Sequence, residues 1–158
     1  WKVDKVVKVV VQRSINAKCI VNNKIVGQSA KGLMLLVGFT DGDNEDIIDY
    51  MIRKIINLRI FEDENNIMNK SILEIDNTSI LSISQFTLYA DTSKGNRPSY
   101  IKAMNGVEAS KLYDLFNKKL ASYIPVETGI FGADMKIEFT NDGPITIILE
   151  RWLWKKTN

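Results

Sequence analysis

Three polar side chains interrupt an apolar strand pattern in the middle of the chain. Residues 79–83 alternate apolar and β-branched residues like a buried strand, and Ser84, Gln85 and Thr87 follow where apolar residues would continue it. A buried polar group without a partner costs roughly 1–3 kcal/mol, so these side chains need backbone, water or a ligand. Two interpretations are open: a strand that emerges at the edge of a sheet, or a binding site.

A second polar interruption lies between the last two predicted strands, at 135–139 and 145–150. Segment 140–146 is rich in residues that favour turns, and Pro144 fixes the direction in which the chain leaves Gly143. A plain hairpin turn is one interpretation. The other is a cis Gly143–Pro144 bond, which costs only about 0.5–1 kcal/mol at X-Pro and would turn two carbonyl acceptors to one side.

The chemistry available to the chain is narrowed by what it lacks. It contains no histidine, which excludes Ser-His and Cys-His triads, a histidine base and histidine-ligated metals. Its single cysteine, Cys19, excludes an internal disulfide and a zinc site built on several thiolates, and we predict that it is a small buried hydrophobe. Catalysis would have to use carboxylates, hydroxyls, backbone amides or groups of the substrate, and no metal or other cofactor is expected.

The overall composition is that of an ordinary globular protein. A length of 158 residues predicts a single domain over 1–158, and a net charge of +2 permits a nucleic-acid partner without arguing for one. Apolar runs are shorter than the roughly 18 residues of a membrane span, and Lys5 and Lys8 interrupt the start of the chain. We expect a cytoplasmic protein that does not enter a membrane.

The hydrophobic pattern predicts an α+β fold with more sheet than helix. An amphipathic helix is expected after the N-cap Asp43, with an isoleucine and methionine stripe to Ile56, and a second over 107–123. Asn22 and Asn23 predict a type I′ hairpin. The continuously apolar run 33–39 predicts a strand buried on both faces, which helices must cover. Strands are expected at 7–12, 15–21, 24–27, 33–39, 58–61, 79–89, 126–131, 135–139 and 145–150.

Taken together, the two polar interruptions resemble motifs of the D-aminoacyl-tRNA deacylases. Segments 84–89 and 141–146 carry the resemblance, and either alone is weak, whereas both at this spacing are specific. Supporting segments follow in the same order at 9–13, 57–61, 94–99 and 128–135, so that the resemblance covers about residues 7–150.

Such enzymes hydrolyse the ester between a D-amino acid and the terminal adenosine of tRNA, and they also act on some glycyl-tRNAs. The resemblance implies α/β/β layers, with a mixed, mostly antiparallel sheet curled toward a barrel and two main helices outside. It also implies a homodimer with active sites at the interface. Gly143 and Pro144, joined by a cis bond, would be lent to the partner's pocket, where their carbonyls leave no room for an L side chain.

The resemblance also implies a role for each site residue. Arg13 would brace the Gly-Pro loop, and Phe131 and Met135 would hold the terminal adenine, which suits stacking on apolar and aromatic surface. The catalytic end would be lined by Ser84, Gln85, Phe86 and Thr87. Backbone amides near the last three are the expected oxyanion donors, and the ribose 2′-OH would orient the attacking water. Because no base is visible for Thr87, we expect it to position the substrate.

The two ends of the chain depart from the family pattern. About six residues precede the first predicted strand, and a tail follows the last, in which Trp152 and Trp154 would extend a strand, cover the dimer edge or be disordered.

Two alternative functions remain open. One is a tRNA- or DNA-binding module without catalysis, for which Lys94, Arg97 and Lys102 would serve. The other is a related editing enzyme with a trans Gly-Pro bond and relaxed chirality.

Overall fold

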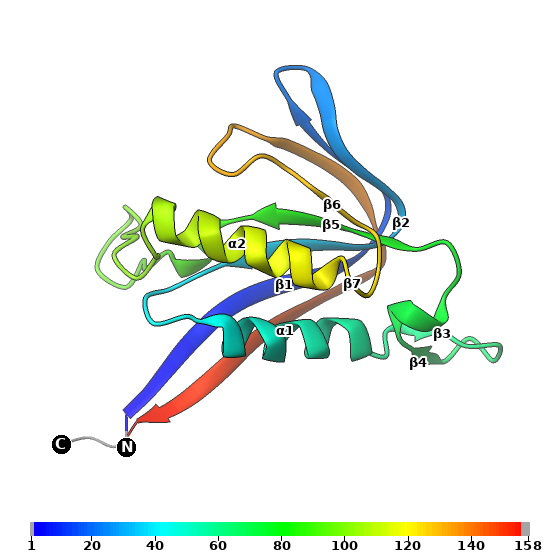
Figure 1. Cartoon of the computed structure of the whole chain (residues 1–158), viewed down its shortest axis with the longest axis horizontal. Coiled ribbons are helices and arrows are strands. Elements are labelled where there is room, and N and C mark those ends of the chain that lie inside the picture. The colour runs from blue at the N-terminus through cyan, green and yellow to red at the C-terminus, as the bar shows by residue number, and fades with distance from the viewer. Residues whose placement is uncertain (1, 156–158) are drawn as a thin grey trace.

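One open sheet of five strands carries two helices on one face (Figure 1). The computed structural model describes residues 2–155, with the side chains of residues 7–151. The strands are β1 (Lys2–Val21), β2 (Lys24–Gly38), β3 (Phe61–Glu62), β4 (Met68–Lys70), β5 (Ser79–Ser84), β6 (Val126–Thr128) and β7 (Lys136–Lys155). The helices are α1 (Glu45–Asn57) and α2 (Gly106–Leu120), with 3-10 turns at Ile72–Glu74 and Phe86–Tyr89.

The strand order in the sheet is β6-β5-β2-β1-β7, and β3 and β4 form a small separate sheet. β1 runs antiparallel to β2 and β7, whereas β5 runs parallel to β2 and β6. In the described part of the chain β6 and β7 form the two edges, so the sheet is not closed into a barrel. The predicted α+β class with a mixed sheet is confirmed.

The layers arise because alternate residues of each strand face opposite sides of the sheet. Val9 on β1 and Leu33 and Leu35 on β2 face the helices and join the larger buried cluster. On the other face Leu81 of β5 packs in a second cluster with Phe139 of β7, although two strands lie between β5 and β7. The sheet therefore curls over this cluster, which gives the predicted α/β/β layers.

The hairpin at 22–23 forms as predicted. Asn22 and Asn23 have φ values of 50° and 62°, as a type I′ turn requires. The strands on either side are longer than expected, because β1 continues through Arg13 and the two segments predicted at 24–27 and 33–39 belong to the single strand β2. In the antiparallel ladder between these two strands, Arg13 of β1 lies opposite Leu33 of β2.

Helix α1 has the predicted buried stripe of isoleucine and methionine. The predicted N-cap at Asp43 is wrong: Asn44 is the N-cap, and its side chain accepts a hydrogen bond from the Ile47 N–H at 3.2 Å. The Asp43 carboxylate instead accepts from the N–H groups of Val7 at 3.0 Å and Thr40 at 2.8 Å. Asp43 thus ties β1 to the entrance of helix α1.

The largest difference between the predicted and the observed topology lies in β7. The segments expected as two strands joined by a hairpin turn both belong to β7 and pair with β1, through Thr140 opposite Ile15 and Thr146 opposite Gln12. Residues 142–145 therefore leave the ladder as a bulge opposite Arg13. The chain does not reverse there, because β1 supplies one continuous partner for both halves.

At the far end of β7 the backbone of Trp152 to Lys155 pairs with that of Lys2 to Lys5, so the tail extends a strand (Figure 1). Whether the tryptophan rings cover a dimer edge lies outside the described side chains. Within residues 2–155, neither helix is long and apolar enough to cross a membrane.

Candidate active site

A cavity of about 610 Å³ lies at the carboxyl end of β5. Its walls come from the end of β2, residues 83–86, the first turn of α2 and the loop between β6 and β7. Figure 1 shows these segments meeting at the end toward which the β5 arrow points. The volume lies in the range of pockets for small ligands.

Five of the predicted site residues line this cavity, and they are Ser84, Gln85, Phe86, Phe131 and Met135. Thr87 is exposed beside it, where its hydroxyl accepts a hydrogen bond from the Gln85 side-chain amide. Gly143 and Pro144 of β7 and Arg13 of β1 do not line the cavity. The structure therefore divides the predicted site into two groups.

The end of the cavity that is predicted to be catalytic lies where the strand pattern breaks. β5 lies between β2 and β6, but its ladder with β6 ends at Ser82, so that Ser84 is paired with Val37 of β2 alone. The strand predicted to continue through Tyr89 ends at Ser84 instead, and a 3-10 helix follows from Phe86. The turn is tight: a Cβ on Gly38 would lie 2.9 Å from the Gln85 carbonyl oxygen, so this approach needs glycine.

The geometry narrows the set of candidate oxyanion donors. The Gln85 N–H donates to the Val37 carbonyl at 2.8 Å and is therefore committed. The N–H groups of Phe86 and Thr87 are the first two of the 3-10 helix, and such positions have no acceptor within the helix. Of the expected donors, these two amides are therefore the ones left without a backbone partner inside the helix.

The residues predicted to hold the adenine are fixed by their neighbours. The Phe131 ring packs against the Tyr113 ring of α2, with centroids 5.9 Å apart and planes tilted by 44°. The Tyr113 hydroxyl donates to the Ser82 carbonyl of β5 at 2.6 Å, and burial raises the pKa of Tyr113, which keeps the donor proton in place. Met135 packs on the buried cluster that contains Cys19, which is fully buried, as predicted.

Acid–base groups are scarce at the cavity. Among the described residues that line it, Asp134 carries the one carboxylate, and this group pairs with Lys136 at 3.1 Å. The Thr87 hydroxyl accepts from an amide. The arrangement fits a site that positions a substrate better than one that uses an activated nucleophile.

The Gly143–Pro144 pair stands at the exposed tip of the bulge in β7. Its peptide bond is cis, as the resemblance implies. Arg13, only 8% exposed, holds the base of the bulge: Nε donates to the Asp142 carbonyl and Nη1 to the Ile60 carbonyl, both at 2.9 Å. One guanidinium thus joins the bulge to the segment after α1.

Asn141 closes the other side of the bulge. Its side-chain oxygen accepts from the Ile145 N–H at 2.7 Å, and its amide nitrogen donates to the Thr146 hydroxyl at 2.9 Å. Gly143 has φ of +141°, and a Cβ there would lie 2.7 Å from Ile145 Cγ1. The bulge is therefore a braced surface feature that requires glycine at its tip.

The bulge and the cavity are far apart within one chain. Gly143 lies at the level of Arg13, which pairs with Leu33, and Leu33 pairs with Ile80, four residues before Ser84. Along the chain into β7, Gly143 also lies eight residues after Met135 of the cavity wall, which corresponds to a separation on the order of 25 Å in an extended strand. A single copy of the chain does not bring these two parts together.

The comparison with known proteins decides the family. Residues 10–150 match the family model described as D-Tyr-tRNA(Tyr) deacylase. The chain belongs to this family. A D-aminoacyl-tRNA deacylase from Limosilactobacillus reuteri (strain DSM 20016) is 53% identical over 145 residues, which cover 91% of this chain and 99% of that protein. Membership of the deacylase family makes the chain an ester hydrolase that acts on D-aminoacyl-tRNA.

Two solved structures are also similar to this deacylase. A c-Myc DNA unwinding element binding protein shares 38% identity with a TM-score of 0.85, covering 91% of this chain and 98% of that one. A probable eukaryotic D-amino acid tRNA deacylase shares 19% identity with a TM-score of 0.78, covering 94% of this chain and all of that one. The second likeness supports the fold alone.

Several lining residues escaped the sequence analysis. Tyr100 and Met104 come from the loop between the 3-10 helix Phe86–Tyr89 and α2, and Asn105 and Gly106 from the start of α2. The N-cap pattern of Asn105 marks the start of a helix, but no local signal shows that this end faces the cavity. Tyr113 belongs to the apolar face of α2, and its hydroxyl alone could have indicated a buried partner.

Proposed function

We propose that the chain hydrolyses the ester between a D-amino acid and the 3′-terminal adenosine of tRNA, with glycine on a non-cognate tRNA as a second substrate. The observation that carries this proposal is the meeting, in one cavity, of the polar end of β5 with the apolar surface of Phe131 and Met135. A terminal adenosine needs the apolar surface, and its ester needs the polar end.

The reaction follows from this arrangement. The adenine stacks on Phe131 and Met135, and the ester carbonyl lies at the amides of Phe86 and Thr87, which stabilise the negative charge that develops on its oxygen. The neighbouring ribose 2′-OH orients a water molecule, whose oxygen attacks the carbonyl carbon. The bond to the 3′ oxygen breaks, and a proton passes from the water to that oxygen. The Thr87 hydroxyl positions the ester.

Selection of the D enantiomer needs a second chain in this proposal. Gly143 and Pro144 are exposed, braced through Arg13, and far from their own cavity, so they are suited to enter the cavity of a partner in a homodimer. Their carbonyls would stand against the α-carbon of the amino acid and exclude an L side chain, whereas glycine, which has none, would pass.

The function is tested by single-turnover hydrolysis of D-tyrosyl-tRNA, L-tyrosyl-tRNA and glycyl-tRNA, with excess chelator present. We expect cleavage of the D ester and the glycyl ester but not of the L ester. Equal cleavage of both enantiomers would contradict the chiral filter. A D-tyrosyl ester on tRNA that ends in 2′-deoxyadenosine should react about a hundredfold more slowly, the effect of losing a positioned proton-transfer group, and an unchanged rate would contradict the role of the 2′-OH.

A second candidate function is binding of nucleic acid without catalysis. It is favoured by the similarity to a protein named for binding a DNA unwinding element and by the exposed Lys94, Arg97 and Lys102 near the cavity. Retention of tRNA or DNA without turnover of any ester, with affinity that falls steeply as salt rises, would favour this function over hydrolysis.

A further inference from the structure

We propose that Phe86 and Tyr100 form a stacking platform for the base that precedes the terminal adenosine of the tRNA. This inference rests on the proposed function, since it assumes that the terminal adenosine occupies the cavity. It assigns a role to Tyr100 and to the exposed ring of Phe86, whose backbone amide serves the ester.

The two rings form a defined pair at the edge of the cavity. Both residues line it, their ring centroids are 4.9 Å apart, and their planes meet at 70°, an edge-to-face arrangement. Phe86 is 57% exposed and Tyr100 41% exposed. Residues that line a cavity and remain this exposed lie at its mouth. In an edge-to-face pair the edge of one ring meets one face of the other ring. The pair therefore leaves the remaining ring faces available to a flat ligand.

The pair is held in place by its backbone. Tyr100 follows a loop closed by two hydrogen bonds, from the Asp91 N–H to the Ser99 carbonyl at 2.8 Å and from the Ser99 N–H to the Asp91 carbonyl at 2.9 Å. The Tyr100 carbonyl accepts from the Ala103 N–H at 3.0 Å, and Phe86 begins the 3-10 helix after β5. Because the backbone of this platform is already fixed, little conformational entropy is lost when a base stacks on it.

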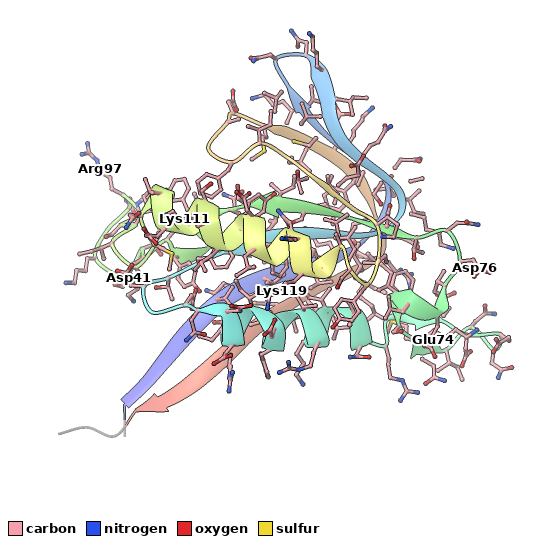
Figure 2. The ribbon with its side chains drawn as sticks, in the orientation of Figure 1. Asp41, Glu74, Asp76, Arg97, Lys111 and Lys119 are labelled. Atoms are coloured by element: carbon pink, nitrogen blue, oxygen red, sulfur yellow. The ribbon has the colours of Figure 1, made fainter. Side chains whose placement is uncertain are left out.

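The surroundings indicate where the nucleic acid runs. The loop closed by Asp91 and Ser99 carries Lys94 and Arg97, and Figure 2 shows Arg97 extending from the molecule at the cavity end. Cations of this kind bind phosphates and fix the register of a strand, whereas aromatic faces bind bases of any sequence. A strand that leaves the cavity across Tyr100 therefore meets first an aromatic surface and then positive charge.

The test compares two minimal substrates that differ by one nucleotide: D-tyrosyl-adenosine and the D-tyrosyl ester of the dinucleotide cytidylyl-adenosine. The wild-type chain should have the larger kcat/KM on the dinucleotide. In Tyr100→Ala the ratio of kcat/KM between dinucleotide and adenosine should fall about tenfold, the usual effect of losing one stacked base. Tyr100→Phe should keep the wild-type ratio, because the ring face remains.

Tyr123→Ala is the matched control. Tyr123 is 54% exposed and lies outside the cavity, in a groove beside Asp49 and Lys119. This variant should leave both substrates and their ratio unchanged. Sedimentation or mass photometry of Tyr100→Ala separates loss of stacking from loss of assembly.

The outcomes are distinguishable from failure of the proposed function. If the wild-type chain hydrolyses neither substrate nor D-tyrosyl-tRNA, both proposals are overturned. If it hydrolyses both minimal substrates and Tyr100→Ala keeps their ratio, the platform alone is overturned. A Tyr100→Ala variant that no longer assembles like the wild type also overturns the platform, since it places the ring in a contact between subunits.

Discussion

Replacing Arg13 by lysine tests whether one guanidinium holds the Gly-Pro bulge. Arg13 donates from Nε to the Asp142 carbonyl and from Nη1 to the Ile60 carbonyl, each at 2.9 Å, and it is 8% exposed. A lysine ammonium is a single point on a flexible stem and does not reproduce this fork. At best it retains one of the two acceptors.

The expected loss of stability comes from the carbonyl, of Asp142 or Ile60, that lysine does not reach. A hydrogen bond that involves a charged group contributes about 1.5–3 kcal/mol, and its loss leaves a carbonyl without this donor. Arg13→Lys should therefore lower the free energy of unfolding by about 2 kcal/mol. With a urea slope near 2 kcal/mol per molar, the unfolding midpoint falls by about 1 M. The D-over-L selectivity of hydrolysis should fall with it, because the bulge becomes mobile.

Urea unfolding at a fixed protein concentration measures the first effect, and Arg59→Lys is the matched control. Arg59 is exposed, and its Nε also donates to a backbone carbonyl, that of Asn69 at 2.9 Å. Exposed substitutions of this kind usually change stability by no more than about 0.5 kcal/mol. The reasoning is refuted by an Arg13→Lys midpoint within the error of wild type, or by equal shifts in the two variants.

Three further substitutions test other parts of the structure. Gly143→Ala would place a Cβ 2.7 Å from Ile145 Cγ1; displacement of the bulge should cut the ratio of D to L cleavage at least about tenfold, and an unchanged ratio contradicts the filter. Tyr113→Phe removes the 2.6 Å hydrogen bond to the Ser82 carbonyl and should cost about 1 kcal/mol in urea unfolding, so equal midpoints would show that this bond adds nothing. Burial raises the pKa of Asp43 to about 6, against two backbone N–H groups that lower it. Because this pKa lies above that of the unfolded chain, the folded state binds the proton more tightly, and stability falls as the pH rises from about 4 to 6. The difference in unfolding free energy between wild type and Asp43→Asn should follow that slope, and a difference independent of pH contradicts it.

Local patterns predicted the parts of the fold that depend on local physics. The stripe of α1 has the helical period and packs as expected, and Asn22 and Asn23 adopt the positive φ that asparagine tolerates. The bulge in β7 was misread because turn residues show only that the chain leaves its strand. Whether the chain then reverses depends on β1, which pairs with both flanks of the bulge and lies more than a hundred residues earlier.

In the candidate site, too, some features follow from the local sequence and others only from the fold. The polar interruption at Ser84 and Gln85 located one end of the cavity, because polar groups that leave water need partners whatever the topology. No local pattern shows that Tyr100 meets Phe86 or that Tyr113 supports Phe131, since these contacts join segments that only the fold brings together. The separation of the bulge from the cavity is likewise a property of strand order, which composition and spacing do not contain.

The central claim is that one active site is divided between two chains, and complementation tests it most directly. A chain with Phe131→Ala and Met135→Ala lacks the adenine site but keeps an intact bulge, whereas Gly143→Trp keeps the cavity and carries an indole that blocks the partner's cavity. Each variant alone, with its fold checked by thermal unfolding, should be inactive on D-tyrosyl-tRNA.

The decisive measurement is hydrolysis of D-tyrosyl-tRNA after the two variants are unfolded, mixed in equal amounts and refolded together. In a mixed dimer the intact cavity receives the intact bulge, so random pairing into dimers should restore about a quarter of the wild-type activity. A mixture as inactive as its components would contradict the account, because the indole would then be blocking the cavity of its own chain.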